Sequence, residues 1–281
     1  MNRIIIDAGA TKTDFIVLNG GVEVAHHIGK GINPNYCSEA EMMQVFADFV
    51  PHCPNSSLIE EIYYYGAGCA SDSNQLYMQQ LMSAFFPMAN CLVYSDLLAV
   101  CHALSRAERA IVCILGTGSA SCLSDGTNLE HRAPSLGFML GDDGSGTNLG
   151  KRLLTAYLNR QLPENISLEL EKCFDVSFDK VIHRIYKESE PNRFMASFAP
   201  FVHEHLNNEV IWQLSEDAFS DFFAKQRVHY PVNESMRWHL SGSVAFHFQE
   251  VIRISAEKQQ CKIGNVVASP MTSLVEYYKS I

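Results

Sequence analysis

The sequence predicts an α/β protein built from two similar lobes, each with three consecutive strands followed by alternating helices and strands. Three observations support this prediction. Apolar runs of strand length alternate with stretches of helical periodicity in the first third of the chain. The same order restarts at Arg109 with "RAIVCILGTGSASCLSDGTNLEH". The length of 281 residues also suits two domains of about 100 to 150 residues. A β-β-β-α-β-α-β-α plan used twice is therefore expected.

In the first lobe, branched apolar runs bounded by glycine and asparagine indicate strands, and apolar residues at helical spacing indicate helices. The expected strands cover residues near 3–7, 14–19, 22–28, 61–66 and 91–95. The expected helices cover residues near 38–50, 73–86 and 97–105.

In the second lobe, a stretch from about 146 to 230 is rich in Leu, Phe, Lys and Glu, and we expect it to be a helical insertion. Afterwards "RWHLSGSV" and "CKIGNVVAS" indicate strands, and "VAFHFQEVIRISAEK" and "MTSLVEYYKSI" indicate helices. We place the first lobe at residues 1–106, joined by the C-terminal helix 270–281, and the second lobe at 107–269. Two lobes of this kind are expected to enclose a ligand cleft.

Composition excludes several classes of function. Hydrophobic residues make up 47% of the chain and charged residues 19%, and no apolar run approaches the roughly 20 residues of a membrane span. No basic and apolar leader precedes the first strand, so we expect a cytoplasmic protein without a membrane partner. A net charge of −10 without a basic cluster argues against nucleic acid. Nine cysteines without a Cys-x-x-Cys pair favour reduced thiols over disulfides.

Three polar turns indicate a nucleotide site. "IIIDAGATKTDF" leads from one strand into another, unlike the Walker A and dinucleotide loops, which lead into a helix. Small and hydroxyl residues in such a turn expose backbone N–H groups that can bind an anion, although a plain β-hairpin also explains this stretch. The turn "GTGS" is similar, and Ser-Gly-Ser in "LSGSVA" leaves room for a flat ring. We expect ATP phosphates at Gly9, Ala10, Thr11, Lys12, Thr13, Gly116, Thr117, Gly118 and Ser119, and adenosine at Gly242 and Ser243.

The order of several motifs adds a resemblance over nearly the whole chain. "DAGATKTDF", "GINPN", "YSDLLAV", "LGTGS", "LGFMLGDDGSG" and "SGSVA" follow one another as in N-acetylglucosamine kinases and their relatives in the BadF/BadG/BcrA/BcrD ATPase family. This family is a branch of the actin, hexokinase and Hsp70 superfamily. The resemblance implies two ribonuclease-H-like (actin-like ATPase) lobes, the first on the sugar and phosphate side and the second on the nucleotide side. Magnesium-ATP would be held between them.

The resemblance also implies an activity and a set of residue roles. The expected reaction transfers the γ-phosphoryl group of ATP to the 6-hydroxyl of an amino sugar, with N-acetylglucosamine ahead of glucosamine and N-acetylmuramic acid, in a homodimer. Asp96 would be the general base, although a helix N-cap also explains an aspartate there. Asp7 would place magnesium through water, although a turn-forming aspartate is the plainer explanation. The sugar ligands would be Asn33, Asp96, Thr117, Gly118 and Asp142.

Two departures from the family pattern stand out, because Ala8 and Ala10 replace glycines that are usual in the first turn. If either position required a positive φ, alanine would cost about 1 kcal/mol. Two alternatives also stay open. One is an iron-sulfur ATPase that activates a 2-hydroxyacyl-CoA dehydratase, although the cysteines here are scattered through apolar segments. The other is a sugar-binding sensor that has kept the fold and lost phosphoryl transfer.

Overall fold

The computed structural model describes residues 1–106, 108–231 and 236–279 of the chain. It contains two compact units, each with one five-stranded mixed sheet, which confirms the predicted α/β fold class. The first unit comprises Met1–Ala107, Gly126–Asn128 and Pro270–Ile281, and the second comprises Glu108–Asp125 and Leu129–Ser269. The turn Gly126–Asn128, which the sequence placed in the second lobe, thus belongs to the first unit.

The first unit has its sheet in the order β3-β2-β1-β4-β5. Its strands are β1 (Asn2–Ala8), β2 (Lys12–Asn19), β3 (Val22–Lys30), β4 (Glu61–Gly66) and β5 (Asn90–Ser95). The first three are antiparallel neighbours, whereas β4 and β5 run parallel to β1. The carboxyl ends of β1, β4 and β5 therefore meet at one edge of the sheet, the usual ligand edge in α/β proteins.

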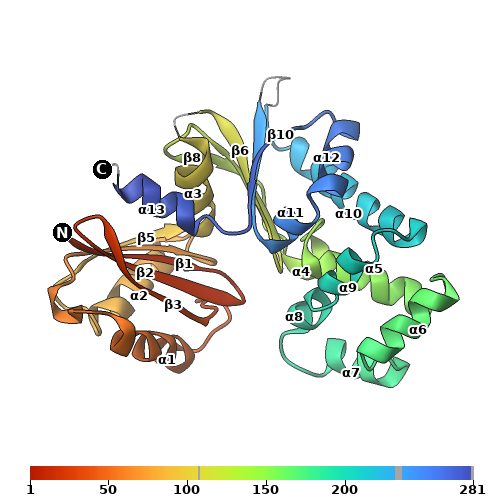
Figure 1. Ribbon diagram of the computed structural model, residues 1–281, viewed down its shortest axis with the longest axis horizontal. Helices are drawn as coiled ribbons and strands as arrows, with labels where there is room; N and C mark the ends of the chain where they lie inside the picture. Colours follow the sequence, from red (N-terminus) through yellow and green to blue (C-terminus); the bar gives the residue numbers. More distant parts are fainter. Residues whose placement is uncertain (107, 232–235, 280–281) are drawn as a thin grey trace. The chain divides into compact units, whose positions relative to one another are not determined.

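Helices cover both faces of this sheet (Figure 1). They are α1 (Glu39–Phe49), α2 (Asp72–Ser83), α3 (Asp96–Val100) and α13 (Met271–Lys279), with short turns η1 (Val50–His52) and η2 (Ser56–Leu58) and a π-helical turn η3 (Cys101–Ser105). Apolar side chains of α1 and α2 pack with Ile4, Ile6 and Phe15 to form one core. On the opposite face, tyrosines of β4 contact η3 and α13.

The second unit repeats this plan, because its sheet has the order β10-β9-β6-β7-β8. Its strands are β6 (Ala110–Leu115), β7 (Ser119–Ser124), β8 (Leu129–Arg132), β9 (Arg237–Ser241) and β10 (Lys262–Val267). Again three antiparallel strands are followed by two that run parallel to the first. The predicted duplication of the β-β-β-α-β-α-β-α plan is confirmed.

The predicted helical insertion lies between β8 and β9 and supplies much of the second core. The helices of this unit are α4 (Gly137–Leu140), α5 (Gly146–Leu158), α6 (Glu164–Cys173), α7 (Phe178–Tyr186), α8 (Pro191–Ala196), α9 (Ala199–Glu204), α10 (Glu209–Arg227), α11 (Ser243–His247) and α12 (Gln249–Lys258). The sequence predicted one helix where α11 and α12 are separated at Phe248, and it did not predict α4. None of the described helices is long and apolar enough to cross a membrane.

A buried hydrogen-bond chain joins three segments of the first unit that are far apart in sequence. The Nε2 atom of His102 lies 3.0 Å from the carbonyl oxygen of Thr127, which can only accept, so Nε2 carries the proton. The Nδ1 atom of the neutral ring must then accept a hydrogen bond from the Tyr65 hydroxyl, 2.8 Å away. The Tyr65 oxygen in turn accepts from the Tyr278 hydroxyl at 2.5 Å. This chain ties α13 and the turn containing Thr127 to η3 and β4.

We expect Tyr65→Phe to destabilise the protein, because it leaves the Nδ1 atom of His102 and the Tyr278 hydroxyl without their buried partner. The free energy of unfolding should fall by about 1–3 kcal/mol in denaturant titrations. Tyr63→Phe is the matched control, since the Tyr63 hydroxyl bonds the partly exposed Glu61. Equal losses in the two variants would contradict the assigned chain.

The same histidine predicts a pH dependence of stability. Burial lowers the pKa of His102 from 6.5, and the bond to Thr127 opposes this only in part. Well above pH 6.5 the ring is neutral in both folded and unfolded chains, so it adds no pH dependence there. As the pH falls from 6.5 toward the lower folded pKa, the unfolded chain binds a proton that the folded chain does not, and stability is lost. His102→Gln should make this slope shallower by up to about 1.4 kcal/mol per pH unit. Identical slopes in urea titrations from pH 7.5 to 5.5 would refute the assignment.

Candidate active site

Two carboxylates lie at the carboxyl edge of the first sheet. Asp7 is the last residue but one of the central strand β1 and pairs with Tyr65 of β4, while Asp96 directly follows β5. Both carboxylates act on the neighbouring Tyr64. Burial raises the pKa of its phenol, and the negative charges of Asp7 and Asp96 raise this pKa further. The structure thus brings the predicted base and the predicted magnesium residue to the same edge.

Asp96 is the first residue of α3 and is not itself the N-cap. That position belongs to Ser95, whose Oγ accepts a hydrogen bond from the backbone N–H of Leu97 at 3.3 Å. The Oδ1 atom of Asp96 accepts from the same N–H at 2.9 Å and from the Ser95 hydroxyl at 3.1 Å. Asp96 therefore supplements a cap that its neighbour already provides, and these contacts fix the orientation of its carboxylate.

The first of the predicted phosphate turns joins β1 to β2 and is closed by a hydrogen bond from Gly9 N to Lys12 O of 2.9 Å. Neither Ala8 nor Ala10 has a positive φ, so the alanines carry none of the conformational cost considered for them. The turn lies directly against Gly31, where an added Cβ would come within 2.5 Å of the carbonyl carbon and oxygen of Ala10. Gly31 N also donates to Thr11 O at 3.0 Å. Only glycine permits this support.

The side chains of this turn differ in what they can offer to a phosphate. Lys12 is 54% exposed, and its ammonium lies 3.7 Å from the buried carboxylate of Asp14. His26 contacts the other oxygen of Asp14 at 2.6 Å. Thr13 differs from the expectation, because it is fully buried and its hydroxyl donates to Lys30 O at 2.8 Å. Its hydroxyl proton thus stabilises the pairing of β2 with β3.

Asn33 lies half-buried in the loop between β3 and α1. Its Oδ1 atom accepts a hydrogen bond from Asn35 N at 3.0 Å and lies against Gly68 of the loop that follows β4. Asn35, Gly68 and Asn74 surround this predicted sugar ligand, and none of them was among the predicted site residues. The asparagine-rich "GINPN" was the only sequence signal for this cluster.

In the second unit, the turn Gly116–Ser119 between β6 and β7 is supported by the start of α5. Gly146 N donates to Gly116 O at 2.8 Å, and Thr147 donates to Thr117 O from its backbone N at 3.1 Å and from its hydroxyl at 2.7 Å. Within the turn, Gly116 N donates to Gly118 O at 3.0 Å. The turn is therefore held in one shape by hydrogen bonds to its carbonyl groups.

Asp142 binds directly to this turn. Its Oδ1 atom accepts from Ser119 N at 3.1 Å, and an added Cβ on Gly118 would lie 3.1 Å from its Oδ2. Burial raises the pKa of the Asp142 carboxyl, the Ser119 bond lowers it, and the neighbouring Asp143 raises it again. The Ser119 N–H, expected to face a phosphate, thus has a carboxylate partner.

The adenosine-type turn lies beside the same structure. Gly242 has a φ of 122°, and an added Cβ would come within 2.2 Å of Leu115 O, so the position requires glycine. Ser243 follows as the exposed first residue of α11. The second unit therefore gathers the predicted Gly116–Ser119 turn, Asp142 and the Gly242–Ser243 turn into one cluster.

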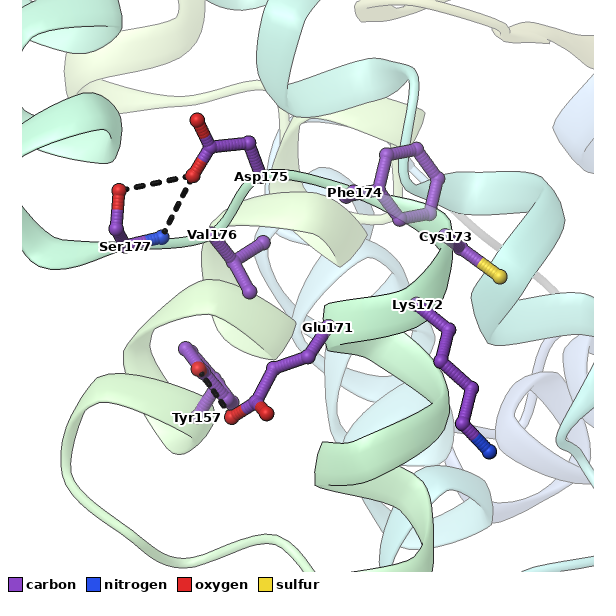
Figure 2. A pocket seen from close by; sticks show the side chains of 8 residues that line it. All are labelled: Tyr157, Glu171, Lys172, Cys173, Phe174, Asp175, Val176 and Ser177. Carbon is purple, nitrogen blue, oxygen red and sulfur yellow. Dashed lines mark hydrogen bonds between the residues drawn. The ribbon is translucent and has the colours of Figure 1, made fainter.

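A separate open hollow of about 510 Å³ lies in the helical insertion (Figure 2). Its lining residues are Tyr157, Glu171, Lys172, Cys173, Phe174, Asp175, Val176 and Ser177. Glu171 accepts from the Tyr157 hydroxyl at 2.7 Å, and Asp175 accepts from the Ser177 hydroxyl at 2.8 Å. None of the predicted site residues lines this hollow, and its acidic side chains bind their own neighbours.

Comparisons with known proteins bear on the whole chain. No protein-family model matches it, and no curated protein matches it. Among solved structures, a candidate N-acetylglucosamine kinase from Porphyromonas gingivalis is 32% identical, with a TM-score of 0.92 over 99% of this chain and 98% of that one. A candidate N-acetylglucosamine kinase from Chromobacterium violaceum, 16% identical over 98% of both chains, has a TM-score of 0.74.

A glucokinase of the ROK family from Streptomyces griseus, solved with glucose and AMPPNP, shares the fold at 15% identity over 99% of this chain and 98% of that one, with a TM-score of 0.62. The fold is thus that of two-lobed sugar kinases with actin-like ATPase lobes. Together with the 32% identity to the P. gingivalis protein across nearly the full length of both chains, it shows that the chain belongs to the N-acetylglucosamine kinase-like family of sugar kinases.

Proposed function

We propose that this sugar kinase transfers the γ-phosphoryl group of ATP to the 6-hydroxyl of an amino sugar, with N-acetylglucosamine as the expected acceptor. The observation that carries the proposal is the placement of Asp7 and Asp96 at the same carboxyl edge of β1, β4 and β5, with Asp7 next to the turn Gly9–Thr13. The name of the P. gingivalis relative supports the choice of sugar.

ATP is the proposed phosphoryl donor, and the glucokinase complex with AMPPNP supports a nucleotide on this fold. The first unit would offer the turn Gly9–Thr13, chiefly through its backbone and Lys12. The second unit would offer Gly116–Ser119, with Gly242 and Ser243 at the adenosine. Because Ser119 N already donates to Asp142, the second turn would offer fewer N–H groups to the phosphates than expected.

Magnesium is the proposed metal, and Asp7 is the residue that would hold it through water. Magnesium in kinases is bound by one or two carboxylates together with phosphate oxygens and waters. The described residues contain no cluster of three or more His, Cys, Asp or Glu side chains suited to a metal, and a site of this kind does not require one. The ion would neutralise charge on the transferring phosphoryl group.

In the proposed transfer, Asp96 accepts the proton of the sugar hydroxyl as its oxygen attacks the γ-phosphorus. A new oxygen–phosphorus bond forms, the bond to the bridging oxygen of ADP breaks, and ADP leaves. Asn33 and Asp142 would orient the sugar, with contacts from Thr117 and Gly118. The contacts of Asp96 Oδ1 with Leu97 N and Ser95 Oγ keep the carboxylate in position.

We expect the purified protein to release ADP from magnesium-ATP when supplied with N-acetylglucosamine, glucosamine or N-acetylmuramic acid in turn. Mass spectrometry of the product should show a sugar 6-phosphate for at least one acceptor. Binding of ATP without a phosphosugar from any of the three would favour a sugar-binding sensor on the same fold.

Asp96→Asn tests the base directly. General-base assistance contributes roughly 10² to 10⁴ in rate, so kcat should fall within about that range, while KM for the sugar stays within a few-fold because the amide still forms hydrogen bonds. The measurement is steady-state turnover of a variant whose thermal melt shows that it is folded.

Asp72→Asn is the matched control for this test. Asp72 is the first residue of α2 and follows the N-cap Ser71, just as Asp96 follows Ser95 at α3. The control should turn over normally. Retention of more than about a third of wild-type kcat by Asp96→Asn would show that Asp96 only supports its helix.

A further inference from the structure

Three asparagines form a hydrogen-bonded series in the first unit. Asn74, in the first turn of α2, donates from Nδ2 to Gly68 O at 2.8 Å and to Asn35 Oδ1 at 2.9 Å. The backbone N–H of Asn35 then donates to Asn33 Oδ1 at 3.0 Å. The series therefore begins on a helix and ends on the residue proposed to bind the sugar.

The partners determine which way the outer two side-chain amides face. The carbonyl oxygen of Gly68 can only accept, so the Asn74 atom beside it must be the NH₂ nitrogen. The backbone N–H of Asn35 can only donate, so the Asn33 atom beside it must be the carbonyl oxygen. The side chain of Asn33 thus has its oxygen turned toward its own loop, which leaves Nδ2 as its group for a ligand.

Gly68 completes this arrangement on the other side of Asn33. It has a φ of +81°, and an added Cβ would lie 2.3 Å from Asn33 Oδ1 and 2.9 Å from Asn35 Nδ2. The Gly68 backbone therefore packs against Oδ1 of Asn33, and Asn74 holds the carbonyl of that same glycine. The loops after β3 and β4 thus pack against each other around the side-chain amide of Asn33.

We propose that Asn74 is a positioning residue for sugar recognition: acting through Asn35 and Gly68, it orients Asn33 so that the substrate meets only the N–H donors of that side chain. This inference rests on the proposed function and specifies its hydrogen-bond pattern. Asn33 then requires an acceptor on the sugar, such as a hydroxyl or acyl carbonyl oxygen. Asp96 and Asp142 require donors, because ionised carboxylates only accept.

The first experiment is Asn74→Asp, which keeps the size of the side chain and replaces the donating NH₂ by oxygen. We expect KM for N-acetylglucosamine to rise about tenfold, the equivalent of one hydrogen bond, while kcat and KM for ATP stay within about threefold. Gln79→Glu is the matched control, since Gln79 lies on the same helix and donates to Cys91 O at 3.1 Å, a contact outside the series. The control should leave all three constants unchanged.

The second experiment is Asn33→Asp, which can still accept from Asn35 N and loses only the outward donors. If the substrate meets Nδ2, KM for the sugar should rise about a hundredfold or more. If the substrate met Oδ1 instead, this variant would bind the sugar nearly normally, and the inference would be overturned.

The outcomes separate this inference from the proposed function. A wild-type protein that phosphorylates no amino sugar overturns the proposed function and the inference with it. Normal wild-type turnover together with an unchanged sugar KM in Asn74→Asp overturns the inference alone. If Asn74→Asp instead lowers kcat, raises KM for both the sugar and ATP, and lowers the melting temperature, the role of Asn74 is merely structural and the inference is also overturned.

Discussion

The candidate site depends on backbone segments that approach one another more closely than any side chain would allow. In the first unit the turn after β1 lies against Gly31, where an added Cβ would be 2.5 Å from the carbonyl of Ala10. In the second unit Leu115 O lies against Gly242, where an added Cβ would be 2.2 Å from that oxygen. Real Cβ contacts of this kind would force the backbone apart, so both turns would move with their carbonyl and N–H groups. Each proposed ligand turn is therefore positioned by a glycine outside itself. The two alanines inside the first turn are tolerated because neither has a positive φ.

The two units use one topology but support their turns differently. The first turn is held by a loop, through Gly31 N and Thr11 O, whereas the second is held by the N-terminal N–H groups of α5. A helix N-terminus usually attracts an anion, but here its donors bind the carbonyls of Gly116 and Thr117. The second turn is thus fixed to the start of α5, and the carboxylate of Asp142 is bound to it through Ser119 N. A sugar held by Asp142 would then be coupled mechanically to the turn proposed for phosphate.

The sequence predicted the architecture well because periodicity reports burial, and the strands of both sheets alternate or run apolar as their burial requires. The roles of Asp7 and Asp96 came from the family resemblance, and the structure places both residues at one edge because parallel strands end together. Contacts between distant side chains left no such signal. Nothing in the sequence shows that Thr13 turns its hydroxyl to Lys30, that Asp142 reaches Ser119, or that Asn74 lies against Asn35. These depend on how loops fold onto each other, which spacing along the chain does not encode.

Asp72 and Asp96 share the same local sequence pattern but lie in different surroundings. Both follow a serine that caps a helix, both begin that helix, and both add negative charge where the helix dipole favours it. The difference lies in what precedes them. Ser71 ends a loop and Asp72 is exposed to solvent, whereas Ser95 ends a parallel strand and Asp96 is partly enclosed at the sheet edge near Asp7. A capping serine followed by aspartate thus occurs at both helices, and at α3 the preceding strand places the carboxylate at the sheet edge, where the proposed phosphoryl transfer would use it.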